Sequence, residues 1–247
     1  MDRLIHTSLS ALKSAMARQT ATANNLANAS TTGFRAEIAT VRPLWLNGAG
    51  LPDRAFASEE VTAADMKSGS VTATGRPLDI ALQGGALLTV QAEDGDEAYT
   101  RRGDLTVGDS GLLTTGDGHP VMGDGGPVTV PPADRITIND DGSVWIVSAG
   151  GDPNTPLQID RLKLASATGS IVVKTIDGLF RVKDGGALPA DPQARLTSHA
   201  LEGSNVNPTT ALVDMIDASR AWDTQVKMLT TAREMDTETA NLMKLPS

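Results

Sequence analysis

The chain has 247 residues, of which 40% are hydrophobic, a formal net charge of −9 and no cysteine. This length and hydrophobic content exclude a disordered chain and are enough to build a packed core, whereas the acidic balance, without any cluster of Lys and Arg, excludes a nucleic-acid-binding surface. The absence of cysteine excludes disulfides and thiolate metal sites.

The N-terminal segment predicts a long amphipathic helix. Residues 4–28 are rich in Ala and Leu and contain no Pro or Gly, a composition that favours a helix. Apolar residues recur there at alternating steps of four and three, which places them along one face as a seam for a partner helix. The seam consists of Ile5, Leu9, Leu12, Met16, Ala23 and Leu26, with the polar Gln19 inside it. Gly33 is available for the left-handed conformation that ends such a segment.

The same N-terminal segment lacks the apolar run that a cleavable signal peptide requires. No stretch of the chain reaches the roughly 18 apolar residues of a membrane-spanning helix. We therefore expect a soluble protein with no direct membrane insertion, which is not exported by the general secretory route.

Two further stretches separate this helix from the C-terminal one. Residues 34–75 contain Pro43, Gly48, Gly50 and Pro52 and show little periodicity. They predict an irregular or extended linker, with one short helix near residues 59–66. From residue 76 to about 200, short β-prone runs alternate with Gly/Asp turns, which predicts an all-β region. The runs are residues 86–91, 112–115, 128–130, 136–138 and 144–147.

The last segment predicts a second long helix. Asn207 can cap its first amides, and Pro208 fits the first helical position, where a missing N–H costs nothing. The pattern runs to Met243, and after Leu229 it slips, stepping by three to Ala232 and again to Met235. Its seam consists of Leu212, Met215, Trp222, Val226 and Leu229, with Ser219 inside it and Ile216 on the same apolar face.

The charges of the two ends are opposite. Residues 1–46 carry five basic and two acidic residues, a net of +3, and residues 201–247 carry four basic and seven acidic residues, a net of −3. Opposite charge favours pairing of the ends, within one chain or between copies, although apolar burial is the larger effect. The predicted class is α+β: a discontinuous domain of coiled-coil-like N- and C-terminal helices (1–33 and 204–247) flanks a linker (34–75) and an all-β domain of short strands (76–203).

No active site, cofactor site or metal site is predicted. His6, His119 and His199 lie in unlike contexts without ligand spacing, and the acidic residues 93–97 lack the spaced oxygens of a calcium loop. The glycine-rich stretches match neither a phosphate-binding loop nor a hydrolase nucleophile turn. The sequence therefore favours a protein that is not an enzyme.

Four segments resemble the flagellar basal-body rod, hook and hook-associated protein family. They are ANNLANASTTGFR at 23–35, GRPLDIALQG at 75–84, YTRRGDL at 99–105 and LEGSNVN at 201–207. The residues that carry the family signature are Asn24, Asn25, Leu26, Ala27, Asn28, Thr32, Gly33, Phe34, Ser204, Asn205, Val206 and Asn207. The opening residues 1–11 look most like the proximal rod members of the family.

The resemblance implies a structural protein of the periplasmic rod, exported by the flagellar type III apparatus without signal cleavage. Its partners would be other flagellar rod proteins, inner and distal, and the export apparatus. Its terminal helices would pack into an inner helical tube, with the β domain outside, and transmit torque. A distal rod protein of the same family is the alternative. Two alternative functions lie outside this family. The chain would then be a ligand-binding or adhesive β module with helical oligomerisation arms, or a hydrolase.

Overall fold

The computed structural model describes residues 2–45, 55–175, 177–183 and 185–242, which form two compact units. The first unit comprises the described residues within 1–27, 37–63 and 207–247. The second comprises those within 28–36 and 64–206. The chain thus passes between the units at four points of the sequence, and each unit has its own architecture.

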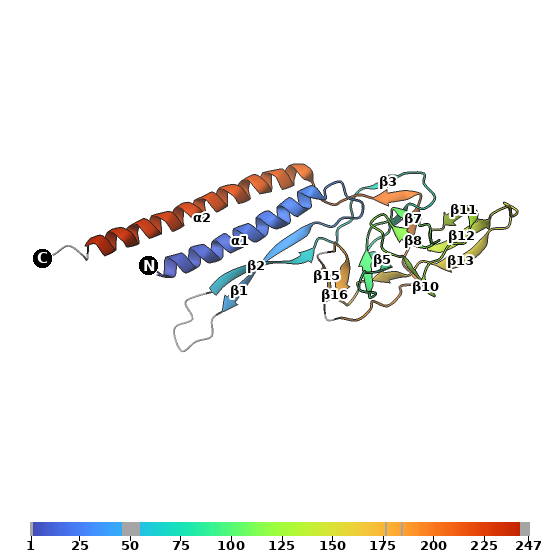
Figure 1. Ribbon diagram of the computed structural model, residues 1–247, viewed down its shortest axis with the longest axis horizontal. Helices are drawn as coiled ribbons and strands as arrows, with labels where there is room; N and C mark the ends of the chain where they lie inside the picture. The colour runs from blue at the N-terminus through green and yellow to red at the C-terminus, as the bar shows by residue number, and fades with distance from the viewer. Residues whose placement is uncertain (1, 46–54, 176, 184, 243–247) are drawn as a thin grey trace. The chain divides into compact units, whose positions relative to one another are not determined.

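The first unit is built from two helices and one pair of strands. Helix α1 spans Asp2–Ala27 and helix α2 spans Pro208–Leu242, and they run side by side in opposite directions (Figure 1). Strands β1 (Glu37–Trp45) and β2 (Ala55–Ala64) pair with each other, and α1 also contacts β1. The predicted cap of α2 is confirmed, because Asn207 Oδ1 accepts hydrogen bonds from the amides of Thr209 (3.0 Å) and Thr210 (3.2 Å).

The second unit is made of short strands. Its largest sheet has the order β14-β5-β6-β16-β15, and a three-stranded sheet has the order β11-β12-β13. The five strands of the largest sheet are β5 (Ala86–Gln91), β6 (Glu97–Thr100), β14 (Leu164–Ser166), β15 (Val172–Lys174) and β16 (Phe180–Val182). The three-stranded sheet comprises β11 (Ala133–Ile138), β12 (Ser143–Ser148) and β13 (Leu157–Arg161).

The other strands of this unit pair two by two. These are β18 (Ala200–Glu202) with β3 (Val71–Ala73), β17 (Leu196–Ser198) with β4 (Ile80–Leu82), β7 (Leu105–Val107) with β8 (Leu113–Thr115), and β10 (Gly126–Pro127) with β9 (Met122–Gly123). The Asp-Gly pairs at 94–95 and 141–142 lie at the β5–β6 and β11–β12 turns, where the sequence predicts turns. The chain as a whole is α+β, with helices at its ends and many short strands between them.

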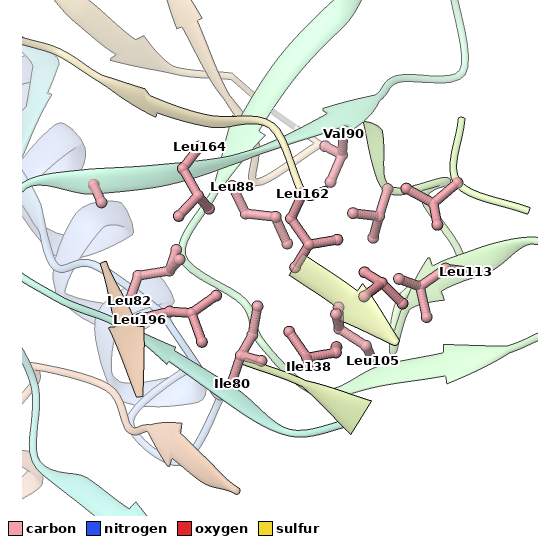
Figure 2. Close-up of a cluster of buried hydrophobic side chains, with 14 of the residues drawn as sticks. Ile80, Leu82, Leu88, Val90, Leu105, Leu113, Ile138, Leu162, Leu164 and Leu196 are labelled. Carbon is pink, nitrogen blue, oxygen red and sulfur yellow. The ribbon is translucent and has the colours of Figure 1, made fainter. Parts of the chain in front are cut away.

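Both faces of the largest sheet are covered. Leu88 and Val90 of β5 point into a core shared with Ile80, Leu113 and Ile138 (Figure 2). The alternate residue Leu87 packs with Tyr99 and Phe180 in a second cluster on the other face. Leucine, isoleucine, valine and alanine fill the larger core, as expected for a chain with three Phe and one Tyr.

Two sequence-based expectations about strands are wrong. The short helix expected near residues 59–66 does not form, because β2 occupies most of these residues. The surrounding stretch, expected to be irregular or extended, is extended where it forms β1 and β2. The alternating pattern typical of a strand was obscured in β1 by Pro43 and in β2 by Glu and Ala residues, which have a weak preference for strands. Residues 128–130 form no strand; only a single bridge joins Thr129 to Leu112. The apolar run there contributes Val128 and Val130 to the core without a ladder of its own.

Candidate assembly interface

The helix pair buries small residues. In α1 the buried side chains are Ser8, Ser14, Ala15 and Ala21, and in α2 they are Ala211 and Ala232. Small side chains let helix backbones approach closely, near the lower end of the usual interaxial distance of about 8–10 Å. Some of the larger apolar residues of both helices are half-buried, and many others face outward.

The face of α2 that is covered within the chain follows a regular seven-residue period. Among the described side chains of α2, only eight are not exposed: Ala211, Met215, Ala218, Trp222, Gln225, Leu229, Ala232 and Asp236. They recur at steps of four and three from end to end, so the predicted slip after Leu229 is wrong. Asp236 continues the period, and Met235, which the prediction placed on the seam, is 42% exposed.

The sequence-predicted seam of α2 is split by the structure. Met215, Trp222 and Leu229 are half-buried on the covered face. Leu212 (46% exposed), Ile216 (51%) and Val226 (38%) lie outside it. An alternating step of three and four residues fits two sets of positions on α2, the predicted seam and the observed covered face, which share every seventh residue. The small Ala211 and Ala218 favour the observed face because they permit close approach of the helices.

The predicted seam of α1 is split in the same way. Leu12 and Leu26 are half-buried, whereas Leu9 (44% exposed), Met16 (60%) and Ala23 lie open. The side chain of Ile5 lies outside those that the structure describes. We call the exposed members of both predicted seams the outer residues: Leu9, Met16, Ala23, Leu212, Ile216 and Val226. They give the first unit apolar surface that nothing in the described chain covers.

The signature segments converge on one buried carboxylate in the second unit. Glu202 is 1% exposed, and its Oε1 accepts hydrogen bonds from Arg35 Nη2 (2.7 Å) and the Gly69 amide (2.9 Å). Its Oε2 accepts from Arg101 Nε (3.0 Å) and Nη2 (2.6 Å). We call these residues, Arg35, Gly69, Arg101 and Glu202, the junction. It joins three segments of the resemblance that lie up to 167 residues apart.

Two buried arginines share this one glutamate, so main-chain oxygens supply further negative potential. Arg101 donates to the carbonyls of Leu82 (2.8 Å), Gly84 (2.8 Å) and Ala86 (2.6 Å). Burial lowers the pKa of the Arg101 guanidinium, and the carboxylate of Glu202 opposes that shift. Hydrogen bonds thus surround the guanidinium of Arg101, a condition under which a buried charge is tolerated. Among the described residues, Nε and Nη1 of Arg35 are buried without a hydrogen-bond partner.

Close backbone approach makes glycine necessary beside the junction. Gly33 has the predicted left-handed φ, 67°, its amide donates to the Glu202 carbonyl (2.7 Å), and a Cβ there would lie 2.4 Å from the Arg101 carbonyl oxygen. A Cβ on Gly69 would lie 2.1 Å from the Gly203 carbonyl oxygen. Any side chain at either position would push the two backbone segments apart.

Asn205 ties together the segments that lead toward the helices. Its Oδ1 accepts from the Ala36 amide (2.8 Å), and its Nδ2 donates to the carbonyls of Asp65 (2.8 Å) and Lys67 (3.0 Å). The side-chain amide of Asn205 therefore cross-links three stretches of the second unit that adjoin points where the chain passes to the first unit.

The remaining signature residues act locally. Asn25 exchanges two hydrogen bonds with the backbone of Glu37 (2.7 and 3.0 Å), and Asn24 Nδ2 donates to the Glu37 carboxylate (2.6 Å), which fastens the end of α1 to β1. Asn28 accepts from Thr31 in the turn after α1, and Ser204 Oγ accepts from the Val206 amide. The ring of Phe34 is buried beneath the ammonium of Lys174, 3.6 Å from the ring centroid. Leu26, Thr32 and Val206 are half-buried and Ala27 is exposed.

The junction arginines and Glu202 were not among the residues singled out from the sequence. Spacing could not reveal them, because the partners are 101 and 167 residues apart. The available signal was compositional: charged residues stand inside otherwise apolar or small-residue signature segments.

The described residues show no constellation that suggests catalysis. His199 has a φ of 58° and its carbonyl accepts from the amides of Thr74 and Gly75, a turn role between β17 and β18. Across the described ranges no cluster of three or more His, Asp or Glu side chains is placed to hold a metal ion. Neither described helix combines the length and apolarity needed to cross a membrane.

Comparison with known families gives three matches along the chain. Residues 5–35 match "Flagella basal body rod protein", residues 81–146 match "Flagellar hook protein FlgE/F/G D1 domain", and residues 197–242 match "Flagellar basal body rod FlgEFG protein C-terminal". The first covers most of α1, the last contains α2, and the middle one contains β5 to β11 and most of β12.

Similar proteins match over nearly the whole chain. The flagellar basal-body rod protein FlgF of Salmonella typhimurium is 43% identical over 99% of this chain and 100% of its own length. FlgF of Escherichia coli is 43% identical over 93% of each chain. FlgG of Bacillus subtilis, also named a flagellar basal-body rod protein, is 30% identical over 99% of this chain and all of its own. None of these relatives is named as an enzyme, and the chain belongs to the flagellar basal-body rod protein family as a structural component of the rod.

Proposed function

We propose that this protein is a subunit of the proximal rod that self-assembles by covering the outer residues of its helix pair with neighbouring subunits. The observation that carries the proposal is the exposure of Leu9, Met16, Leu212 and Ile216 at 44%, 60%, 46% and 51%. Burying one such side chain contributes about 1.5–3 kcal/mol. A few contacts of this kind, repeated along a stack of subunits, are sufficient to drive assembly.

The pairing of helices within one chain leaves the end of α2 free for a contact along the stack. Residues 237–241 are all exposed, beyond the last covered position at Asp236. Helix α2 is nine residues longer than α1 (35 against 26), a difference of about 14 Å at 1.5 Å per residue. An overhang offered to a subunit above or below produces a head-to-tail contact, which builds a filament when the symmetry does not close.

The junction supports the transmission of torque. The segments of the second unit that adjoin the points of passage to the first unit are cross-linked by Glu202 and Asn205. These cross-links lie within the second unit and would keep its connecting segments from unravelling under load. The role of the second unit is therefore lateral stiffness.

We further propose the cellular context. The partners are other rod proteins, inner and distal, and the flagellar type III export apparatus, which would carry the chain into the periplasm without cleavage. The family membership and the resemblance at residues 23–35 support this. We expect a strain that lacks the export apparatus to stop secreting the protein. In the parent strain, the exported protein should have the same mass as the uncleaved chain.

A distal position in the rod is the second candidate. It is favoured by the full-length similarity to FlgG of Bacillus subtilis, but the identity of 30% is lower than the 43% to FlgF of Salmonella typhimurium and Escherichia coli. Locating a tagged chain in isolated basal bodies distinguishes the two, because a proximal subunit remains on fragments of the rod that retain only its membrane-near part.

Aspartate substitution of an outer residue tests the assembly proposal. Met16→Asp or Leu212→Asp should abolish rod formation and motility, since each places a charge where a neighbour would bury it. Circular dichroism of the purified variants should remain that of the parent, because both positions are already exposed. Thr231→Asp adds the same charge at an exposed position of α2 outside the outer residues and should leave motility intact. Normal motility of the Met16 and Leu212 variants would contradict the proposal.

A further inference from the structure

A groove crosses the outer face of the three-stranded sheet β11-β12-β13 in the second unit. Its volume is about 370 Å³, and it is lined by Arg135, Thr137, Asn139, Trp145, Ile146, Val147 and the prolines 153 and 156. This volume lies within the range of about 300–1,000 Å³ that is usual for small-molecule sites. Trp145 stands directly opposite Thr137 across the strands, on the face away from the core residues Ile138, Val144 and Ile146.

The chemistry of the groove is that of an aromatic wall flanked by hydrogen-bonding groups. The indole N–H of Trp145 already donates to Ser143 Oγ (2.8 Å), so the half-buried ring offers the groove its carbon surface and not its N–H. Asn139 Nδ2 donates to the same hydroxyl (3.3 Å), which leaves its Oδ1 to accept. Within the described part of the chain, the hydroxyl of Thr137 has no hydrogen-bond partner.

Arg135 is the only charged residue lining the groove, and no ion pair to it is formed among the described residues. The chain as a whole carries a net charge of −9. An exposed, unpaired guanidinium in an acidic protein attracts a small anion and favours bidentate binding of a carboxylate.

We propose that this groove binds a glycan whose sugar units carry carboxylates. A pyranose ring has a C–H face that packs on an aromatic ring and a rim of hydroxyls that exchange hydrogen bonds with Thr137 and Asn139. Its carboxylate pairs with Arg135, and Pro153 and Pro156 add apolar lining to the groove. The site is independent of the outer residues of the helix pair, which belong to the other unit.

The test is a titration of the full-length protein with defined oligosaccharides, followed by calorimetry and by the NMR signal of the Trp145 indole N–H. The acidic probes are the N-acetylglucosamine–N-acetylmuramic acid disaccharide, as a cell-wall source, and a tetramer of galacturonic acid, as a uronic-acid source. Chitotetraose is the neutral probe. We expect at least one acidic probe to bind, to shift the Trp145 signal and to bind more tightly than chitotetraose, and the tighter acidic probe identifies the source.

Matched variants assign the contacts. Arg135→Ala should weaken binding of the acidic probe by about tenfold or more, as expected for loss of a charge-assisted pair, whereas Lys183→Ala removes an exposed cation elsewhere in the same unit and should leave it unchanged. Trp145→Leu should weaken acidic and neutral probes alike. Absence of binding by every probe, equal binding of acidic and neutral probes, or an unaltered affinity in Arg135→Ala would overturn the proposal. Self-association that Trp145→Leu abolishes, or preferential binding of a proline-rich peptide, would assign the groove to a protein partner and overturn it as well.

Discussion

Removal of the Glu202 carboxylate should destabilise the second unit more than any other single loss of a charge in it. In Glu202→Ala, the four hydrogen bonds from Arg35, Arg101 and Gly69 to the carboxylate disappear and two guanidinium groups remain buried without a counter-ion. Breaking a buried ion pair by removing one partner costs about 3–5 kcal/mol. Since domains are stable by about 5–15 kcal/mol in total, this is a large fraction of the stability of the unit.

The assay is thermal and urea unfolding of the full-length chain by circular dichroism in the β region of the spectrum. A loss of 3–5 kcal/mol should lower the midpoint by at least about 6 °C for a domain of this size. Glu202→Gln keeps the volume and one acceptor oxygen, so its loss should be smaller but of the same sign. Glu93→Ala, at an exposed turn between β5 and β6, is the matched control and should change stability by less than about 0.5 kcal/mol. If Glu202→Ala behaves like Glu93→Ala, the junction is not what holds the signature segments together.

Three further outcomes follow from local geometry. Asn207→Ala removes the acceptor of the first two capped amides of α2 and should cost about 1 kcal/mol, seen as reduced helix content at elevated temperature. Gly69→Ala places a Cβ 2.1 Å from a carbonyl oxygen and should cost about 1–3 kcal/mol or more in urea unfolding, and an unchanged midpoint would refute the close approach. Hydrogen bonds from the hydroxyl and the amide of Ser143 hold the pKa of Asp141 below its ordinary value, so Ser143→Ala, which removes the hydroxyl, should raise that pKa, as measured by NMR titration of the carboxyl carbon. A depressed carboxyl pKa stabilises the fold only while the carboxyl group is ionised. The contribution of Asp141 to the difference in stability between the parent protein and Ser143→Ala should therefore be present at neutral pH. It should vanish as the pH falls through the folded-state pKa of Asp141.

Local signals in the sequence were sufficient where one residue type has one physical role. The cap at Asn207, the proline at the start of α2, the left-handed Gly33 and the extent of β5 are all visible without a structure. Each depends on a few neighbouring atoms, and distant parts of the chain do not alter the outcome.

The phase of the helix pair could not be settled in this way. Large apolar residues dominate a periodic pattern, so the prediction placed the seam on the face that carries Leu212, Ile216 and Val226. The chain instead covers the face of α2 that carries Ala211, Ala218 and Ala232 together with three large residues of the predicted seam, and it leaves Leu212, Ile216 and Val226 exposed. These exposed members of the predicted seam are the ones that we propose another subunit covers.

The junction was equally beyond sequence reasoning. A buried Arg–Glu–Arg cluster has no local periodicity, and its members come from segments far apart in the chain. The β1–β2 pair was missed for a different reason, since Pro43 and the weak strand formers in β2 conceal its pattern. In both cases tertiary partners decide the conformation, and the residues themselves carry little preference.

Cysteine labelling of the outer residues tests the central claim most directly. The chain has no cysteine, so Met16→Cys and Leu212→Cys each introduce a single reactive thiol on an otherwise unreactive background. In the purified monomer both thiols should react rapidly with a maleimide, as should Ser148→Cys at an exposed position in the second unit. In isolated rods the thiols at positions 16 and 212 should be protected by neighbouring subunits. Equal labelling rates for these two positions in monomer and rod would show that neighbours leave the outer residues uncovered, and would contradict the account.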